Sequence, residues 1–108
     1  MSSLSTHVLD VERGSPAARV PVALYHGDEQ LARGETNTDG RIANLASGEL
    51  GPGTYRLVFD VATYFAAHDR PAPFLQQVSI DFRVDAAQRH YHVPLLVSPY
   101  ACTSYRGS

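Results

Sequence analysis

The chain has 108 residues, of which 44% are hydrophobic and 19% are charged, and this composition predicts a single compact domain spanning residues 1–108. Nine arginines against eleven acidic residues give a net charge of −2, which leaves no basic surplus for a phosphate backbone, so we expect no nucleic-acid partner. Lysine is absent, which excludes Schiff-base chemistry and a P-loop, and the sole cysteine, Cys102, excludes an intrachain disulfide and a cysteine-rich zinc site.

Targeting signals are not evident in the sequence. The first twenty residues lack the cationic start and the apolar run of a secretory signal, and no stretch approaches the ~20 apolar residues of a membrane span. We therefore expect a soluble, cytoplasmic protein that does not bind membranes.

A period of two, typical of β-strands, begins near the N-terminus. It predicts a strand over residues 7–12 and another over 20–25. Next along the chain, Asp39-Gly40 is a dipeptide that favours a turn with positive φ. We expect this turn to join two short strands, over residues 35–38 and 41–45, in a hairpin.

The middle of the chain predicts a strand, a helix and a second strand. Over residues 55–60, an apolar face of Tyr55, Leu57 and Phe59 alternates with Arg56, Val58 and Asp60, which predicts a strand. The alternation breaks at residues 61–68, where Asp60 is placed to cap the N-terminus of a short helix and Pro71 to end it. It resumes without error over residues 78–85, as expected of a strand with one face on a core and the other in water.

The C-terminal part of the chain returns to strands. Residues 90–97 alternate, with His90, His92 and Pro94 on the same face. Because proline donates no backbone hydrogen bond, Pro94 predicts a sheet edge or an interrupted ladder. Residues 100–105 are a further strand candidate. Seven or eight short strands and one short helix in this length predict an all-β fold, a two-sheet antiparallel sandwich.

Five histidines are the side chains best suited to acid–base chemistry, because imidazole titrates near pH ~6.5. His26 and His68 lie beside predicted turns and are expected to be solvated loop residues. His7 and His92 lie inside predicted strands, and His90 shares a face with His92. Three interpretations stay open for these residues: satisfied histidines at a sheet rim, ligands of a metal ion, or a metal-free acid–base pair beside a guanidinium.

Two other places in the sequence offer partners for the histidines. Arg41 follows the predicted turn, where an arginine is ordinarily a solvated surface residue. The last four residues would ordinarily be a frayed terminus, yet they carry the phenol of Tyr105, the guanidinium of Arg106, the hydroxyl of Ser108 and a carboxylate in a row. This density of functional groups is unusual for a disordered end.

Four segments together resemble one known family. They lie in the order found in the 5-hydroxyisourate hydrolases, also called transthyretin-related proteins, and together they extend over nearly the whole chain. The segments are Leu4–Asp10, Thr36–Arg41, His90–Pro99 and Tyr105–Ser108. The C-terminal tetrapeptide is the most telling, because in this family it separates the hydrolases from the transthyretin hormone carriers, which share the fold and lack it.

The resemblance implies an eight-stranded transthyretin-like sandwich with a short helix between the fifth and sixth strands, assembled as a homotetramer of two dimers with sites at subunit interfaces. It implies hydrolysis of 5-hydroxyisourate, the product of urate oxidation, to 2-oxo-4-hydroxy-4-carboxy-5-ureidoimidazoline on the route to allantoin, without a cofactor. The family's catalytic positions fall on His7, Arg41, His92 and Ser108. Its substrate-binding positions fall on His7, Arg41, Tyr105 and Ser108.

Each of these residues suits a step in opening a ring amide. Two neighbouring imidazoles repel each other when both are cationic, so we expect His7 and His92 jointly to bind and activate a water molecule, with either as the base. Arg41 would present a planar fork of donors to the substrate and to the forming oxyanion. Ser108 would hold the heterocycle or orient a histidine through its hydroxyl or its carboxylate, and a covalent role for this hydroxyl is the less favoured variant.

Two other classes of protein stay open at this point. A carrier of the transthyretin type would bind an apolar or aromatic ligand without catalysis. A metal-dependent hydrolase would use His90, His92 and His7 as ligands.

Overall fold

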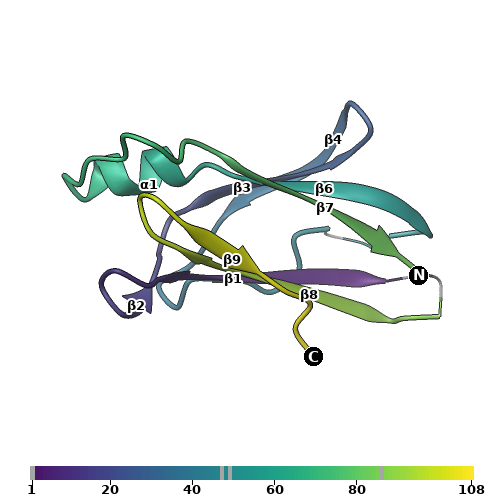
Figure 1. Cartoon of the computed structure of the whole chain (residues 1–108). Coiled ribbons are helices and arrows are strands. Elements are labelled where there is room, and N and C mark those ends of the chain that lie inside the picture. The colour runs from purple at the N-terminus through teal and green to yellow at the C-terminus, as the bar shows by residue number, and fades with distance from the viewer. Residues whose placement is uncertain (1, 47, 49, 86) are drawn as a thin grey trace.

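The computed structural model describes residues 2–46, 48, 50–85 and 87–108, and within them the chain forms two β-sheets packed face to face (Figure 1). The elements are β1 (Ser3–Asp10), β2 (Ser15–Pro16), β3 (Pro21–His26), β4 (Glu29–Glu35), β5 (Arg41–Ile42), β6 (Gly53–Phe59), α1 (Val61–Ala67), β7 (Val78–Val84), β8 (His90–Val97) and β9 (Cys102–Ser104). One sheet has the order β2-β1-β8-β9, with β5 also paired to β1, and the other has the order β4-β3-β6-β7. The helix lies at one end of the sandwich.

The predicted two-sheet sandwich is confirmed, but one strand pair is parallel where the prediction had antiparallel sheets. Strands β1 and β8 run parallel, from the pair Ser3 and His90 to the pair Asp10 and Val97, whereas the other described pairs are antiparallel. Parallel strands cannot be joined by a tight turn, and here the entire second sheet and the helix lie between them in the sequence. The pairing brings the N-terminal histidine segment against the C-terminal one.

Strands β1 and β8 each present one face to the core and the other outward. On β1 the buried side chains are Leu4, Thr6, Val8 and Asp10. On β8 the buried side chains on the core face are Tyr91, Val93, Leu95 and Val97. Burying a large apolar side chain stabilises the fold by ~1.5–3 kcal/mol, so this face is firmly held by the packed interior. The histidines on the opposite face therefore stand on a rigid base.

The helix α1 forms as predicted and is capped at its N-terminus by Asp60. The Asp60 carboxylate accepts hydrogen bonds from the amide of Thr63 at 3.1 Å and from its hydroxyl at 2.7 Å. Such a cap typically stabilises a helix by ~1 kcal/mol. The helix ends at Ala67, ahead of Pro71. Within the residues that the structure describes, no helix is long and apolar enough to cross a membrane.

A buried ionic cluster ties the helix to the end of β1. The carboxylate of Asp10 accepts a hydrogen bond from the Tyr64 hydroxyl at 2.7 Å and pairs with the guanidinium of Arg70, which also pairs with Glu12. Burial by itself raises the pKa of Asp10. The hydrogen bonds from Arg70, from Tyr64 and from the amide of Arg13 outweigh burial and lower this pKa to about 2.

The predicted hairpin around Asp39-Gly40 is wrong, although the turn itself is present. Gly40 has a φ of 76°, and the Asn37 side chain closes the turn by accepting hydrogen bonds from the amides of Asp39 and Arg41, both at 2.9 Å. The strand before the turn, β4, pairs with β3 in one sheet, and the strand after it, β5, pairs with β1 in the other. The turn therefore carries the chain between sheets.

Several predicted strand boundaries also need correction. The N-terminal strand covers Ser3–Asp10 instead of residues 7–12, because its first residues pair with β8, a partner far away in the sequence. The strand predicted over 35–38 is wrong beyond Glu35, where β4 ends, and the strand predicted over 41–45 is only two residues long. The strand candidate at 100–105 contains β9, Cys102–Ser104.

Candidate active site

Strand β1 places His7 at the centre of a polar face. His7 lies directly opposite Arg41 of β5 on one side and Pro94 of β8 on the other, and Ser5 lies opposite His92. Residues directly opposite each other in neighbouring strands project from the same face of a sheet. His7, Arg41 and His92 therefore share the outer face of this sheet, on the side away from the core.

Gly40 explains how Arg41 comes to lie beside His7. A Cβ at Gly40 would lie 2.5 Å from the carbonyl oxygen of Val8, and its φ of 76° is one that other residues rarely adopt. The turn can therefore pack directly on β1, where the amide of Val8 donates a hydrogen bond to the carbonyl of Gly40 at 2.7 Å. Arg41 follows immediately and pairs with His7.

His92 is half-buried and is surrounded by positive groups. Burial lowers the pKa of His92 below its usual 6.5, and the charges of Arg41, His7 and His90 lower it further, which together outweigh a hydrogen bond to the Ser5 backbone that raises it. At neutral pH the ring is therefore largely neutral and able to accept a proton.

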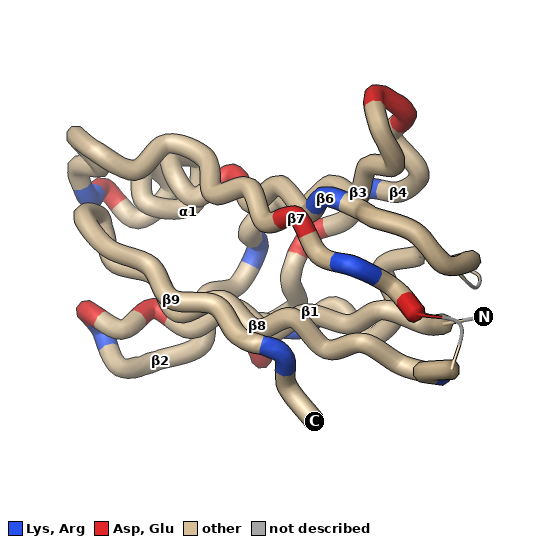
Figure 2. Tube along the Cα trace, turned by 45° about the vertical axis from the view of Figure 1, so that its right-hand side comes forward, with Lys and Arg blue, Asp and Glu red and all other residues tan. Residues whose placement is uncertain are grey.

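Elsewhere along the chain, acidic and basic positions are interspersed over both sheets (Figure 2).

The His92 ring is held on the side of Nδ1 by serine. Ser5 Oγ lies 2.7 Å from Nδ1 of His92 and 2.8 Å from Nε2 of His90, and Ser3 Oγ lies 2.5 Å from Nδ1 of His90. His90 and His92 share a face, as the alternation predicts. In the part of the chain that the structure describes, no three His, Cys, Asp or Glu side chains converge in the manner of metal ligands.

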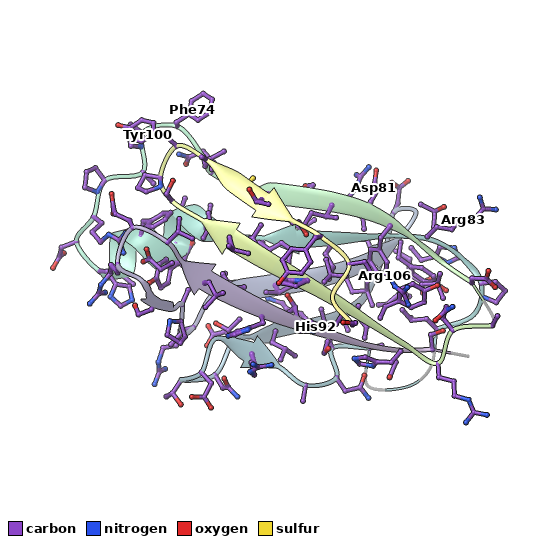
Figure 3. All side chains as sticks on the ribbon, turned by 60° about the horizontal axis from the view of Figure 1, so that its bottom comes forward. Phe74, Asp81, Arg83, His92, Tyr100 and Arg106 are labelled. Carbon is purple, nitrogen blue, oxygen red and sulfur yellow. The ribbon has the colours of Figure 1, made fainter. Side chains whose placement is uncertain are left out.

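The C-terminal tail reaches the same histidine (Figure 3). The amide of Gly107 donates a hydrogen bond to the carbonyl of His92 at 2.8 Å. Pairing of β8 with β9 stops at Leu95 and Ser104, so Pro94 lies in the gap between β9 and the Gly107 contact. This arrangement confirms the prediction that Pro94 marks an interrupted ladder.

Tyr105 and Arg106 lie beside side chains of β7 and β8. They line a cavity of about 300 Å³ at the open edge between the two sheets, together with Ile80 and Phe82. The Arg106 guanidinium lies 4.9 Å from the centre of the Tyr91 ring and donates a 3.1 Å hydrogen bond to the side chain of Gln88. Tyr105 is 56% exposed.

The remaining predicted residues are distributed as follows. Ser108 is exposed and directly follows Gly107, next to His92. His26 and His68 are exposed, as predicted, and each contacts a tyrosine: the ring centres of His26 and Tyr55 are 4.8 Å apart, and those of His68 and Tyr64 are 4.7 Å apart.

Sequence reasoning missed Ser3, Ser5 and Gly107 as neighbours of the site. The two serines alternate with His7 along β1, and this period could have placed them on its face. Their contact with His90 and His92 depends on the parallel register between β1 and β8, for which no local pattern in either segment gives a signal.

Comparison with known proteins places the chain in a family. The model of the HIUase/Transthyretin family matches residues 4–107. The chain belongs to this family. A 5-hydroxyisourate hydrolase from Caulobacter vibrioides is 45% identical over 115 aligned positions, covering 100% of both chains. The structure of Klebsiella pneumoniae 5-hydroxyisourate hydrolase superposes with a TM-score of 0.92 at 40% identity, again with 100% of both chains covered.

The carrier branch of the HIUase/Transthyretin family has the same fold. Sea bream transthyretin, solved in complex with thyroxine, superposes with a TM-score of 0.88 at 30% identity, covering 97% of this chain and 94% of that one. The hydrolases named above are more similar in sequence over the full length. They confirm the prediction that the chain is an enzyme of this hydrolase kind.

Proposed function

We propose that the chain hydrolyses 5-hydroxyisourate to 2-oxo-4-hydroxy-4-carboxy-5-ureidoimidazoline, with a histidine-activated water molecule and without a metal ion. The observation that carries this proposal is the shared face of His7, Arg41 and His92, which the C-terminal tail reaches through Gly107. The substrate is the one named for the family's hydrolases at 40–45% identity.

In the proposed reaction His92 is the base. Its lowered pKa keeps the ring neutral, so it takes one proton from water while the water oxygen attacks the ring carbonyl. Collapse of the tetrahedral intermediate breaks the C–N bond, and the leaving nitrogen receives the proton that His92 took from water. His7, on the neighbouring strand and the same face, would bind the water and share in these transfers.

Arg41 stabilises the negative charge that forms on the carbonyl oxygen. Its planar guanidinium offers two parallel donors to the substrate edge and to the oxyanion. A donor aimed at a forming oxyanion typically contributes ~10²–10³-fold in rate. The same positive charge helps to keep His92 neutral, so Arg41 supports both steps.

The tail completes the proposed site. Ser108 adjoins the Gly107 contact with His92 and would hold the polar heterocycle through its hydroxyl or its carboxylate. Tyr105, which lines the edge cavity, would contact substrate in the site of a neighbouring subunit. A homotetramer of two dimers, with sites at subunit interfaces, fits both features.

The cytoplasmic location expected from the sequence stays a prediction.

A kinetic assay with product identification tests the proposal. Freshly generated 5-hydroxyisourate decays spontaneously, which gives the baseline, and the chain should accelerate the loss of its absorbance and yield the ureidoimidazoline carboxylate by NMR. Exhaustive chelation should leave this rate unchanged. A rate equal to the baseline, together with saturable binding of thyroxine, would favour a carrier. Loss of activity on chelation, restored by a divalent metal ion, would favour the metal-dependent reaction.

A further inference from the structure

Two serines and a third histidine adjoin His92 and have no role in the reaction proposed above. Ser5 Oγ contacts both Nδ1 of His92 and Nε2 of His90, at 2.7 Å and 2.8 Å, and Ser3 Oγ contacts Nδ1 of His90 at 2.5 Å. The four side chains form one continuous hydrogen-bonded chain on the outer face of β1 and β8. It runs from half-buried His92 to exposed His90.

The backbone register builds this hydrogen-bonded chain. In the parallel pairing of β1 with β8, Ser3 lies opposite His90 and Ser5 lies opposite His92. Between them, on the other face, Leu4 and Tyr91 are buried in the core. The serines are therefore held at the histidines by packed strands, which limits how far either partner can move.

The hydroxyl of Ser5 couples the protonation states of the two rings. A serine hydroxyl has a single proton to donate, so it can donate to one of the two imidazoles and must accept from the other when both rings are neutral. A hydrogen on Nδ1 of His92 consequently directs the Ser5 hydroxyl toward Nε2 of His90. His90 then carries its hydrogen on Nδ1 and donates it to Ser3.

The ring nitrogen of His92 that is open to substrate decides which tautomer serves the reaction. Nδ1 faces Ser5, and the Cδ2 edge lies against Gly107, where an added Cβ would be only 2.5 Å away. Among the residues that the structure describes, none makes a hydrogen bond with Nε2. A base acting through Nε2 needs its neutral ring to hold hydrogen on Nδ1, and the hydrogen bond at the other nitrogen is what sets the tautomer.

We propose that Ser5 and His90 are positioning residues that set His92 in the Nδ1–H tautomer at the start of each turnover and carry its Nδ1 proton toward solvent and back. This inference rests on the proposed function. In that reaction His92 takes a proton from water, so the ring must pass a proton on before it can serve the next turnover.

The transfer balances atom by atom and returns the chain to its starting state. When water is deprotonated, His92 gains a proton on Nε2 and gives its Nδ1 proton to the Ser5 oxygen, Ser5 gives its hydroxyl proton to Nε2 of His90, and His90 gives its Nδ1 proton to Ser3 or to solvent. When the C–N bond breaks, His92 gives its Nε2 proton to the leaving nitrogen, and the same chain runs inward and restores the hydrogen on Nδ1 of His92.

The charges around His92 favour this outward transfer. The titratable or charged groups around it are His7 from β1, Arg41 from β5 and His90 from its own strand, and the tail adds the carboxylate assigned above to Ser108, which follows the uncharged Gly107. A positive charge on His92 is repelled by the charge of Arg41, which favours loss of a proton from the imidazolium.

Nitrogen-15 NMR of the full chain tests the tautomer without any substrate. At a pH where His92 is neutral, His92 and His90 should both be predominantly Nδ1–H, and Ser5→Ala should move His92 toward the Nε2–H form. Ser79 is an exposed serine on β7, so Ser79→Ala should leave the tautomers of both rings unchanged. An Nε2–H tautomer for His92 in the unmodified chain would overturn the inference, as would an unchanged His92 in Ser5→Ala.

Kinetics of 5-hydroxyisourate loss tests the proton route. Ser5→Ala should lower kcat by ~10–100-fold with KM nearly unchanged, since loss of a group that orients a catalytic ligand or base has this typical size. Ser5→Thr keeps the hydroxyl and should restore kcat to within about threefold of the unmodified chain. Equal losses in Ser5→Ala and Ser5→Thr would indicate packing instead of hydrogen bonding and would overturn the inference.

Chemical rescue distinguishes a role of His90 in proton transfer from a role in holding its neighbours in place. His90→Gln keeps a hydrogen-bonding group at the position of Nε2 but cannot pass a proton onward, so kcat should fall by ~10-fold and rise again with the concentration of imidazole buffer. Ser79→Ala should show no buffer dependence. A His90→Gln enzyme at full activity, or one insensitive to buffer, would contradict the relay.

The two proposals fail in different ways. If the unmodified chain does not accelerate substrate loss, the proposed function is wrong, and the NMR tautomers still decide whether Ser5 orients His92. If the unmodified chain is active while Ser5→Ala keeps its kcat and its His92 tautomer, only the relay is wrong.

Discussion

Gly107 and His92 are in direct contact through both backbone and side chain. The Gly107 amide donates a 2.8 Å hydrogen bond to the His92 carbonyl, and a Cβ on Gly107 would lie 2.5 Å from Cδ2 and 3.2 Å from Cγ of the ring. Only glycine fits against the imidazole at this distance. The position of the tail and the orientation of the ring therefore depend on each other.

Replacing this glycine should disable the site without unfolding the protein. In Gly107→Ala the added methyl group must displace either the tail or the imidazole, so we expect kcat/KM for 5-hydroxyisourate to fall by ~10-fold or more, with an unchanged circular dichroism spectrum. Gly51→Ala is the matched control, because a Cβ at Gly51 has no atom within 4 Å. Full activity in Gly107→Ala would show that the tail contact is dispensable.

Arg41→Lys should separate the shape of the guanidinium from its charge. Lysine keeps the positive charge but loses the two parallel donors, so kcat should fall by ~10²–10³-fold. Arg33→Lys, on the exposed face of β4, should retain the unmodified rate. Steady-state kinetics of both variants provides the comparison, and equal rates for them would remove Arg41 from the oxyanion role.

The pH dependence of kcat/KM should reflect the lowered pKa of His92. Neutral His92 is the active form, so the rate should decrease as the pH falls, and the midpoint of this decrease should lie below 6.5. Arg41→Gln removes one of the charges that lower this pKa, so the acid limb should move to higher pH. In Arg41→Lys the limb should stay in place. An acid limb at the same pH in Arg41→Gln would contradict the assigned electrostatics.

Acid unfolding should depend on the buried Asp10 carboxylate. Its pKa of about 2 lies below the ordinary 3.8, so the ionised form stabilises the folded state by about 2 kcal/mol above pH ~4, and this stability is lost as the pH falls toward 2. In Asp10→Asn, urea unfolding should show this pH dependence largely removed and the overall stability reduced by ~3 kcal/mol, because Arg70 loses its buried partner.

The exposed pair of Arg56 and Asp81 provides the control for Asp10. Both side chains are more than half exposed, so solvent screens the interaction. Asp81→Asn should therefore keep the acid sensitivity of the unmodified chain. If Asp81→Asn and Asp10→Asn respond alike to acid, the buried cluster does not control acid stability.

Local patterns predicted the elements whose partners lie nearby. Strand β7 and helix α1 match the expected ranges within one residue, because alternation and the Asp60 cap act within a few residues. The hairpin at Asp39-Gly40 failed, since the dipeptide specifies a turn but not which sheet the chain joins afterwards. Gly40 packs on Val8, and that distant contact draws β5 to β1.

The candidate site was predictable in its residue types but not in its geometry. His7, His92 and Arg41 could be chosen because few side chains titrate near neutrality or bind oxyanions well. Their meeting on one face, and the insertion of Ser5 between two histidines, depend on the parallel register of β1 with β8. That register is set by the packing of the whole sandwich, which no short segment encodes.

The catalysed rate of 5-hydroxyisourate loss in His92→Asn, measured beside the unmodified chain and the spontaneous decay, is the most direct test. The unmodified chain should exceed the spontaneous rate, and the variant should lose ~10²-fold or more in kcat/KM because asparagine cannot accept the proton from water. An equal rate in both chains, or no acceleration by the unmodified chain, would contradict an active site built around this imidazole.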